Sequence, residues 1–405
     1  MKMNRQTVIK ELKAKPILNY TRYSLIMAGI WPLRLATQNR LLQRMYSIYS
    51  GLIKVYFPSF LLSLSVQFIL STIDENTDEN PENIFSQLNY IIGLLIVGVA
   101  AVIYQDKNVK EILNYITQDD KEVVCSKDKD IVLCHLKQAR VSSRSCLLIM
   151  ILTFWSGVSM CLENFYRRLE IDHYNKHYNE SVEKPFPYVL YYYNLDPEKH
   201  ATSVLVANNI FVVLNCLLFA STKMLFFSCI IYSTSILKRL QIKFVKLDLC
   251  GKSVSQVLRD LVQQHQNVIE FVAKLNKWIK YLVLLEFLLN SLNIATVSIQ
   301  FITFEKNMLA SPILFFCVLF TQTFVLGWTA NEIKCQSLVL ADILYCCPWY
   351  DQSEKIKSTL LIMILRAQKP LVLTIGPLDA MTIQSALAIL KASYSYVGVM
   401  MNNYK

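Results

Sequence analysis

Apolar residues in this chain gather into long blocks that polar segments separate. Seven blocks are candidates for membrane spans: 45–70, 84–104, 146–162, 201–233, 281–303, 309–330 and 371–401. A helix crosses a bilayer core about 30 Å thick with roughly 20 apolar residues, because each residue rises about 1.5 Å. The third block must borrow flanking residues, and the fourth and seventh must project from the bilayer or break. The pattern predicts an all-α membrane protein with seven transmembrane helices.

The polar segment before the first block holds one short apolar stretch, residues 25–31, which Pro32 and Arg34 end. Polar and basic residues precede this stretch, and it is too short to span, so we expect no cleavable signal peptide. We expect it to be an interfacial or re-entrant element. The first block would then serve as an uncleaved signal anchor.

Composition argues against an ordinary soluble enzyme, since 54% of the 405 residues are apolar. The chain contains no P-loop, no G-x-S-x-G and no H-E-x-x-H, so no catalytic residues are expected. Its 11 cysteines form no CxxC pair and mostly accompany apolar runs, which favours small buried hydrophobes over zinc ligands. His173 and His177 stand four apart among Tyr and Asn, a setting more typical of a solvated loop than of a metal site. We therefore expect neither metal nor cofactor, and leave open a disulfide between outer loops.

The net charge of +11 is distributed unevenly along the chain. Lys and Arg number 30 in the polar segments 1–44, 105–140, 234–280 and 331–370, against six in the segments that alternate with these. Cytoplasmic loops carry the excess of positive charge, so the N-terminus is predicted inside and, after seven spans, the C-terminus outside. An N-x-S/T sequon, at Asn179, falls in the 163–200 loop predicted outside, where glycosylation is possible. A G-protein-coupled receptor would need the opposite orientation.

Several motifs in the last third of the chain follow one another in a characteristic order. They are Gly327-Trp328-Thr329-Ala330-Asn331-Glu332, Ser337, Tyr345, Trp349-Tyr350, Arg366-Ala367-Gln368-Lys369-Pro370 and Leu390-Lys391-Ala392-Ser393-Tyr394-Ser395-Tyr396. In order and spacing this series resembles the signature of insect odorant receptors, and Gly29-Ile30-Trp31-Pro32 near the N-terminus is similar to that family too. A related gustatory receptor would share the fold but usually ends in a different motif.

The resemblance implies the tuning subunit of an odorant-gated, non-selective cation channel in the plasma membrane of sensory dendrites. Members form tetramers with a shared olfactory co-receptor around a central pore lined by the last helix. The implied organisation is a cytoplasmic N-terminal segment (1–44), an outer ligand-binding bundle of helices 1–4 (45–233), helices 5–6 with a cytoplasmic anchor region (234–370) and the pore helix (371–405). In the anchor region, the cytoplasmic ends of the last four helices make the contacts between subunits.

Volatile odorants are small and hydrophobic, so their site needs an apolar cavity with few polar groups. The resemblance places it among the second, third, fourth and sixth helices. Residues at helical spacing there are candidates: Tyr90, Leu94, Thr153, Phe154, Gly157, Met160, Asn208, Phe211, Asn215, Phe316, Phe320 and Thr323. Ordinary helix packing is the alternative for each of them.

The final helix carries the candidate pore residues. On one continuous helix Lys391 would lie about 15 Å below residue 401 and Asp379 about 33 Å below it. Lys391 would then sit in mid-membrane, lining the pore or packed at a subunit interface. Val399 and Asn403 share a helix face and align with the family's pore constriction, and Asn402 matches its polar neighbour. A frayed, solvated C-terminus is the alternative.

Trp349 and Tyr350 resemble the family's contact between subunits in the anchor region. Trp is favoured at such contacts because it buries a large area at low entropy cost. Packing within one subunit is the alternative.

Overall fold

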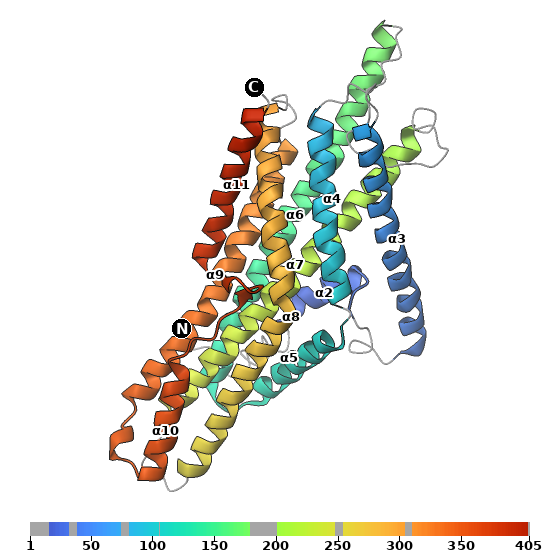
Figure 1. The fold of residues 1–405 in the computed structure, drawn as a ribbon. Coiled ribbons are helices and arrows are strands. Elements are labelled where there is room, and N and C mark those ends of the chain that lie inside the picture. The colour runs from blue at the N-terminus through green and yellow to red at the C-terminus, as the bar shows by residue number, and fades with distance from the viewer. Residues whose placement is uncertain are drawn as a thin grey trace, which may run out of the picture.

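The structure is a computed structural model and describes residues 16–31, 39–73, 81–104, 106–178, 201–247, 254–303 and 310–403. Long helices dominate these residues (Figure 1). They are α2 (Asn19–Met27), α3 (Arg40–Ile73), α4 (Pro81–Ile103), α5 (Lys107–Cys125), α6 (Lys129–Tyr178), α7 (Ala201–Val245), α8 (Val254–Thr303), α9 (Ala310–Cys346), α10 (Glu354–Ala367) and α11 (Ile383–Asn403), with a 3₁₀ turn, η3 (Trp349–Asp351). The one described sheet pairs β1 (Thr374–Ile375) with β2 (Asp379–Ala380) antiparallel. The all-α prediction is confirmed.

The helices α6, α7, α8 and α9 form the central bundle and run most of its length (Figure 1). On one flank of this bundle lie α3 and α4, and on the other lies α11, which reaches only over the upper half of the view. The lower end holds α10 with the end of α9 and the start of α8. One large apolar core passes from α2 and α4 through α7 and α8 to α10, so the chain packs as a continuous bundle.

Five helices of the described chain are long and apolar enough to cross a membrane: α3, α6, α7, α8 and α9. A sixth span results if α4 and α5, bent by 74°, are counted as one broken span. Seven spans were predicted, and α11, the last of them, is not among these five or six. Its 21 residues include Lys391 and several Ser and Tyr, which lower its hydropathy. The chain is thus a helical protein with several membrane-spanning segments.

Most helices extend well beyond the apolar blocks that predicted them. The third block, 146–162, lies inside the 50-residue α6, which continues to Tyr178 where a loop was expected. Similarly, α7 passes without a break through the domain boundary predicted at residue 233. Interhelical ion pairs hold the polar extensions, such as Lys238 Nζ to Glu332 Oε1 at 2.7 Å between α7 and α9. The length of an apolar block therefore underestimates the length of the helix that contains it.

The stretch 25–31 contributes to α2, which packs against α6 and α7. Leu25 and Trp31 are buried, and two hydroxyls of α2 bond to serines of α7: Thr21 to Ser228 at 2.6 Å and Ser24 to Ser221 at 2.5 Å. Because its polar face finds partners inside the bundle, α2 is part of the core. That this stretch is an interfacial or re-entrant element stays a prediction.

The last apolar block, 371–401, is not one helix. Pro370, Gly376 and Pro377 interrupt it, and Gly376 adopts a φ of +56°, which favours a residue without Cβ. The β1–β2 hairpin forms there and is bound to α8: Gly376 N donates to Lys280 O at 2.9 Å, and Thr374 N to Asn276 Oδ1 at 2.8 Å. Asp379 lies in this hairpin, so its predicted depth on a continuous helix was wrong.

Candidate functional site

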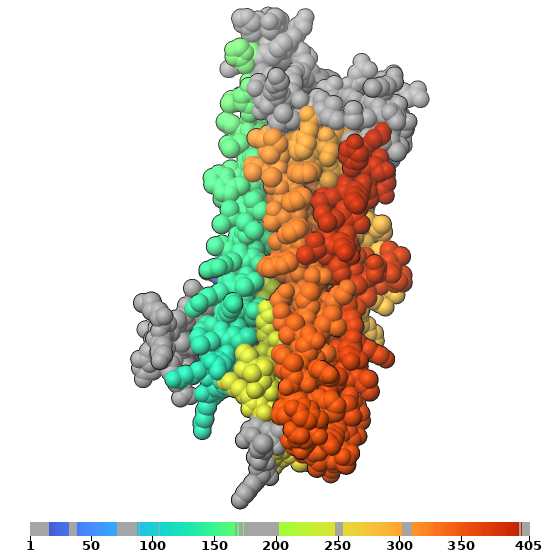
Figure 2. Space-filling view, turned by 90° about the vertical axis from the view of Figure 1, so that its left-hand side faces the viewer, coloured from blue at the N-terminus to red at the C-terminus, as the bar shows by residue number. Residues whose placement is uncertain are grey.

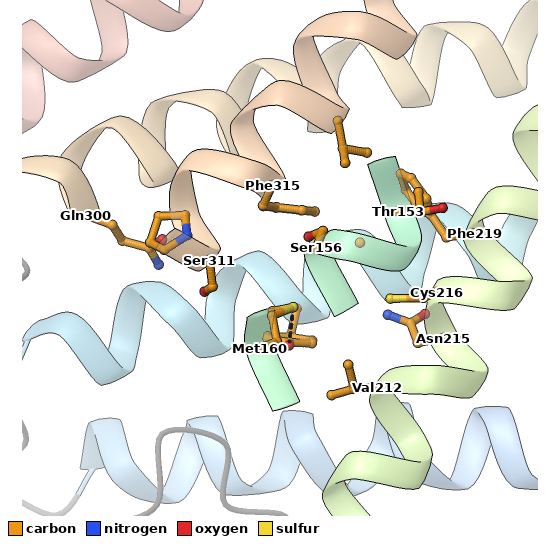
Figure 3. Close-up of a pocket in the computed structure, with 14 residues that line it drawn as sticks. Thr153, Ser156, Met160, Val212, Asn215, Cys216, Phe219, Gln300, Ser311 and Phe315 are labelled. Carbon is orange, nitrogen blue, oxygen red and sulfur yellow. Dashed lines mark hydrogen bonds between the residues drawn. The ribbon is translucent and has the colours of Figure 1, made fainter. Parts of the chain in front are cut away.

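A cavity lies within the upper half of the bundle, where α4, α6, α7 and α9 meet beside the end of α8 (Figure 3). The described residues that line it are Tyr90, Gly93, Thr153, Ser156, Met160, Val212, Asn215, Cys216, Phe219, Gln300, Ser311, Pro312, Phe315 and Val318. For water-sized molecules its volume is about 70 Å³, whereas one water needs about 10–15 Å³. The cavity therefore has room for a compact organic molecule.

Most of the lining is apolar, and its polar groups differ in how they are bonded. Thr153 Oγ1 donates to the carbonyl of Ile149 at 2.7 Å within its own helix. Tyr90 Oη donates to Met160 Sδ at 3.0 Å, and a thioether is a weak acceptor. Asn215 Oδ1 is buried and has no partner among the described residues. An unsatisfied buried amide costs free energy, so a bound molecule that supplies its partner would gain affinity and orientation there.

Four of the twelve predicted ligand-binding residues line this cavity: Tyr90, Thr153, Met160 and Asn215. They come from α4, α6 and α7, three of the four helices expected to form the site. The fourth, α9, contributes Phe315 and Val318 instead of the residues predicted on it.

The other eight predicted residues lie outside the cavity lining. Leu94, Asn208, Phe211 and Thr323 are buried in helix packing, where Phe211 stacks on Phe60 of α3. Phe154 and Phe320 are 63% and 42% exposed on the outer surface of the bundle. Phe316 packs between Phe301 and Phe320. At Gly157 an added Cβ would lie 2.8 Å from Cys216 Sγ, so this glycine lets α6 and α7 approach closely.

Sequence reasoning missed the other ten lining residues. Gln300 comes from α8, which was not expected to contribute, and its signal was an amide inside an apolar run. Phe219 lies four residues after Asn215, on the helix face that the predicted pattern already marked, whereas Cys216 lies on the adjacent face. Ser311 and Pro312 begin α9, and only the three-dimensional arrangement brings them to the cavity.

The predicted pore residues all lie on α11. Lys391 is exposed. Figure 2 shows α11 (red) beside α9 (orange). Val399, Asn402 and Asn403 belong to the last turns of α11, and their side chains lie outside the described part of the structure. The predicted glycosylation site, Asn179, also lies outside the described residues.

The predicted subunit-contact residues form η3, between α9 and α10. Trp349 is partly buried against the main core, and its indole Nε1 donates to Tyr345 O at 3.2 Å. Tyr350 is 63% exposed and packs edge-on against Trp349. Trp349 thus packs within its own subunit, while Tyr350 is exposed at the surface.

Fold and cavity together define a multi-pass helical membrane protein with a small-molecule cavity inside its bundle. Comparison with known proteins names the class: the sequence model of the family 7tm Odorant receptor matches residues 78–394. The chain belongs to this family of insect odorant receptors, and the predicted family is confirmed. It is a family of receptors, not of enzymes.

Curated relatives agree over shorter stretches. Odorant receptor 10 of Aedes albopictus is 32% identical over 150 residues, which cover 37% of this chain and 40% of that protein. Odorant receptor Or2 of Anopheles gambiae is 33% identical over 150 residues, which cover 36% and 39%. Each match thus spans about two fifths of the relative's length.

A solved structure shares the whole fold. The olfactory receptor OR5 of Machilis hrabei, in complex with eugenol, superposes with a TM-score of 0.76 and covers 95% of this chain and 97% of its own. Its sequence identity is 16%, so the likeness concerns the fold.

Proposed function

We propose that this protein is the ligand-binding subunit of an odorant-gated, non-selective cation channel. The observation that carries the proposal is the cavity among α4, α6, α7, α8 and α9, with its largely apolar lining and the unpartnered amide oxygen of Asn215. A volatile molecule gains free energy there mainly by burying its apolar surface. The hydrogen bond to Asn215 then selects among molecules of similar shape.

The Machilis receptor supports a ligand of this kind, since its structure contains eugenol, a small aromatic molecule. For the present chain the lining favours a compact, mostly apolar odorant with one hydroxyl or carbonyl group. Asn215 can accept from a hydroxyl through Oδ1 or donate through Nδ2. Tyr90 can exchange the Met160 sulfur for a better oxygen acceptor on the ligand.

The pore in this proposal is lined by α11 from four subunits. Leu387, Tyr394 and Tyr396 on this helix are 47%, 81% and 41% exposed, so part of its surface is free to meet other subunits and a conduction path. Val399 forms the apolar constriction, flanked by Asn402 and Asn403. Lys391 lies at the exposed surface, either within the pore or between subunits.

The partner proposed is the olfactory co-receptor, joined in a tetramer through the end of the molecule that holds α10. Tyr350, Leu361, Ile362 and Leu365 are each at least 42% exposed there and give an apolar surface suited to subunit contact. This end is cytoplasmic in the proposal, and the complex lies in the plasma membrane. The opposite end of the bundle holds the C-termini of four helices, α3, α6, α8 and α11 (Figure 1). Each of these termini adjoins a segment that is predicted to lie outside.

The decisive test is co-expression with the co-receptor and measurement of whole-cell and excised-patch currents. A panel of alcohols, phenols, ketones and esters of five to ten carbons serves as the ligands. A cation current that persists in excised patches without GTP is expected. Currents that require heterotrimeric G proteins, or an N-terminal epitope tag accessible on intact cells, would refute the proposal.

A further inference from the structure

A lysine and a glutamate form an ion pair deep inside the bundle. Lys223 Nζ of α7 contacts Glu286 Oε1 of α8, and the side chains are 3% and 2% exposed. Both residues lie within apolar, span-length helices, α7 and α8. An ion pair in such surroundings is costly to build, because two charges must be removed from water. Ionisable groups at membrane depth are therefore seldom retained without a function.

The ion pair touches the wall of the odorant cavity through one aromatic ring. Lys223 Nζ lies 5.2 Å from the ring centroid of Phe219, one turn earlier on α7. Phe219 itself lines the cavity. An ammonium this close to an aromatic face is attracted by it, and more strongly where water is excluded. A ligand that displaces the Phe219 ring therefore changes the surroundings of the Lys223 ammonium.

On the other side the ion pair leads to the base of α11. Glu286 lies two residues after Leu284, and the Leu284 side chain packs against Gly376 so closely that a Cβ there would lie 2.7 Å from Leu284 Cδ2. One turn further back, Lys280 O accepts from Gly376 N at 2.9 Å. The β1–β2 hairpin thus rests on the segment of α8 that precedes Glu286, and α11 begins three residues after the hairpin.

Glu286 also provides a second position for its partner. Its other carboxylate oxygen, Oε2, is buried and has no hydrogen-bond partner among the described residues. Lys223 can move from one oxygen to the other without losing its counter-charge. Coupling between two sites requires an element with two discrete arrangements, and the two carboxylate oxygens offer Lys223 two positions.

We propose that Lys223 and Glu286 are positioning residues that transmit ligand occupancy from the cavity to α11. The ligand displaces Phe219, Lys223 shifts on the Glu286 carboxylate, and α8 carries the change to the hairpin from which α11 starts. This inference rests on the proposed function, because it assumes that the cavity binds the ligand and that α11 lines the pore.

The first test replaces the two charges by neutral groups of similar size, in K223M/E286Q. Neutralising both partners avoids an unpaired buried charge, so surface expression is expected to stay near that of the wild type. With the most potent odorant of the panel above, the maximal current is expected to fall, or the half-maximal concentration to rise, by about tenfold, a usual size for coupling between sites. The matched control is R239M/D119N, which neutralises a pair between α7 and α5 away from this path. It is expected to leave the half-maximal odorant concentration, and the current per receptor at the cell surface, unchanged. A wild-type response in K223M/E286Q would overturn the inference.

The second test needs no current. Hydrogen exchange of the 371–382 amides is measured in the purified receptor in nanodiscs, for the wild type, K223M/E286Q and the R239M/D119N control. If the ion pair supports the part of α8 beneath the hairpin, exchange at Thr374, Gly376 and Met381 becomes at least about threefold faster only in K223M/E286Q. Equal exchange in all three proteins would overturn the inference. A wild-type receptor that carries no odorant current would refute the proposed function, and hydrogen exchange would still decide whether the ion pair supports the hairpin.

Discussion

The two ends of the bundle differ in the kind of polar group that they carry. At the end with α10, charged side chains form ion pairs between segments far apart in the sequence: Arg239 with Asp119, Lys238 with Glu332, and Lys246 with Asp128. Buried atoms without a partner in the described structure occur there too, at Arg239 Nε and Tyr232 Oη. Around and below the cavity, buried polar atoms of Asn215, Gln322 and Thr323 have no partner in the described structure.

This difference separates a scaffold from a binding region. Paired charges fix the relative positions of α5, α6, α7 and α9, and they lose stability when one partner is removed. Unpartnered amides and hydroxyls cost stability, so their presence beside a cavity indicates that a ligand or water completes them. In the proposed function, the α10 end supports the fold, and a bound ligand completes the polar groups at the cavity end.

The largest effect is expected from breaking a buried pair at the α10 end with R239M. Arg239 is 8% exposed, and its removal leaves the Asp119 carboxylate, with a side chain 21% exposed, without its cation. Loss of one partner of a buried pair costs about 3–5 kcal/mol, so the receptor is expected to lose most of its surface expression and melt well below the wild type. Thermal unfolding of the purified receptor measures this. In R239M/D119N most of the loss is expected to be recovered, and equal damage in both variants would show that packing, not charge, decides.

A smaller loss is expected from G327A, at the crossing of α9 and α11 between the two ends. A Cβ on Gly327 would lie 2.8 Å from Thr382 O and 2.9 Å from Ala386 Cβ, so α11 must move away from α9. Overpacking of this kind costs about 1–3 kcal/mol. Both the melting temperature and the odorant current are expected to fall. The matched control is G51A, where an added Cβ meets nothing within 4 Å, and a comparable loss there would contradict the steric explanation.

Much of the fold could be predicted from the apolar blocks, because span length is a strong constraint on sequence. What could not be predicted were the extensions beyond the bilayer, as in α6 and α8, since their stability comes from contacts with other helices. The hairpin before α11 was hidden for the opposite reason. Its residues are as apolar as a span. The excess length of the block allowed either a projecting helix or a break, and Pro370, Gly376 and Pro377 indicated where the break lies.

The candidate site could be predicted at the level of helices but only partly at the level of residues. Helical spacing identified the faces of α6 and α7 that carry Thr153, Met160 and Asn215. It could not tell an inward face from an outward one where both are apolar, which is why Phe154 was included although it is 63% exposed. In a membrane protein apolar residues cover both sides of a helix, so hydrophobicity does not report direction.

At the cavity end, N215L is expected to change selectivity more than stability. The substitution removes an unpartnered amide, so the free energy of unfolding should stay the same or rise by up to about 1 kcal/mol. Responses to alcohols and phenols should weaken by about tenfold relative to hydrocarbons of the same shape, because the ligand hydroxyl loses its partner. Dose–response curves for matched pairs of odorants measure this. F154A, outside the cavity, should leave the ranking unaltered, and a changed ranking in F154A alone would mean that the cavity is not the binding site.

The smallest effect is expected from K246Q, at the exposed margin of the α10 end. The Lys246 ammonium hydrogen-bonds to Asp128 and holds the pKa of this carboxyl below its usual range, while Asp128 and Asp130 raise the pKa of Lys246. A lowered carboxyl pKa stabilises the fold above the unfolded pKa, near 4, and this contribution disappears as the pH falls through the lower folded value. A raised lysine pKa contributes below about 10.5 and is lost above it.

The difference in melting temperature between wild type and K246Q should therefore be constant from about pH 5 to pH 9, and should vanish in acid. Because this lysine is solvent-exposed, the difference should be about 1 °C or less and should shrink further in high salt. Melting curves at several pH values and two ionic strengths measure it. A drop in melting temperature as large as that of R239M would contradict this prediction. It would mean that an exposed ion pair contributes as much stability as a buried one at this end of the bundle.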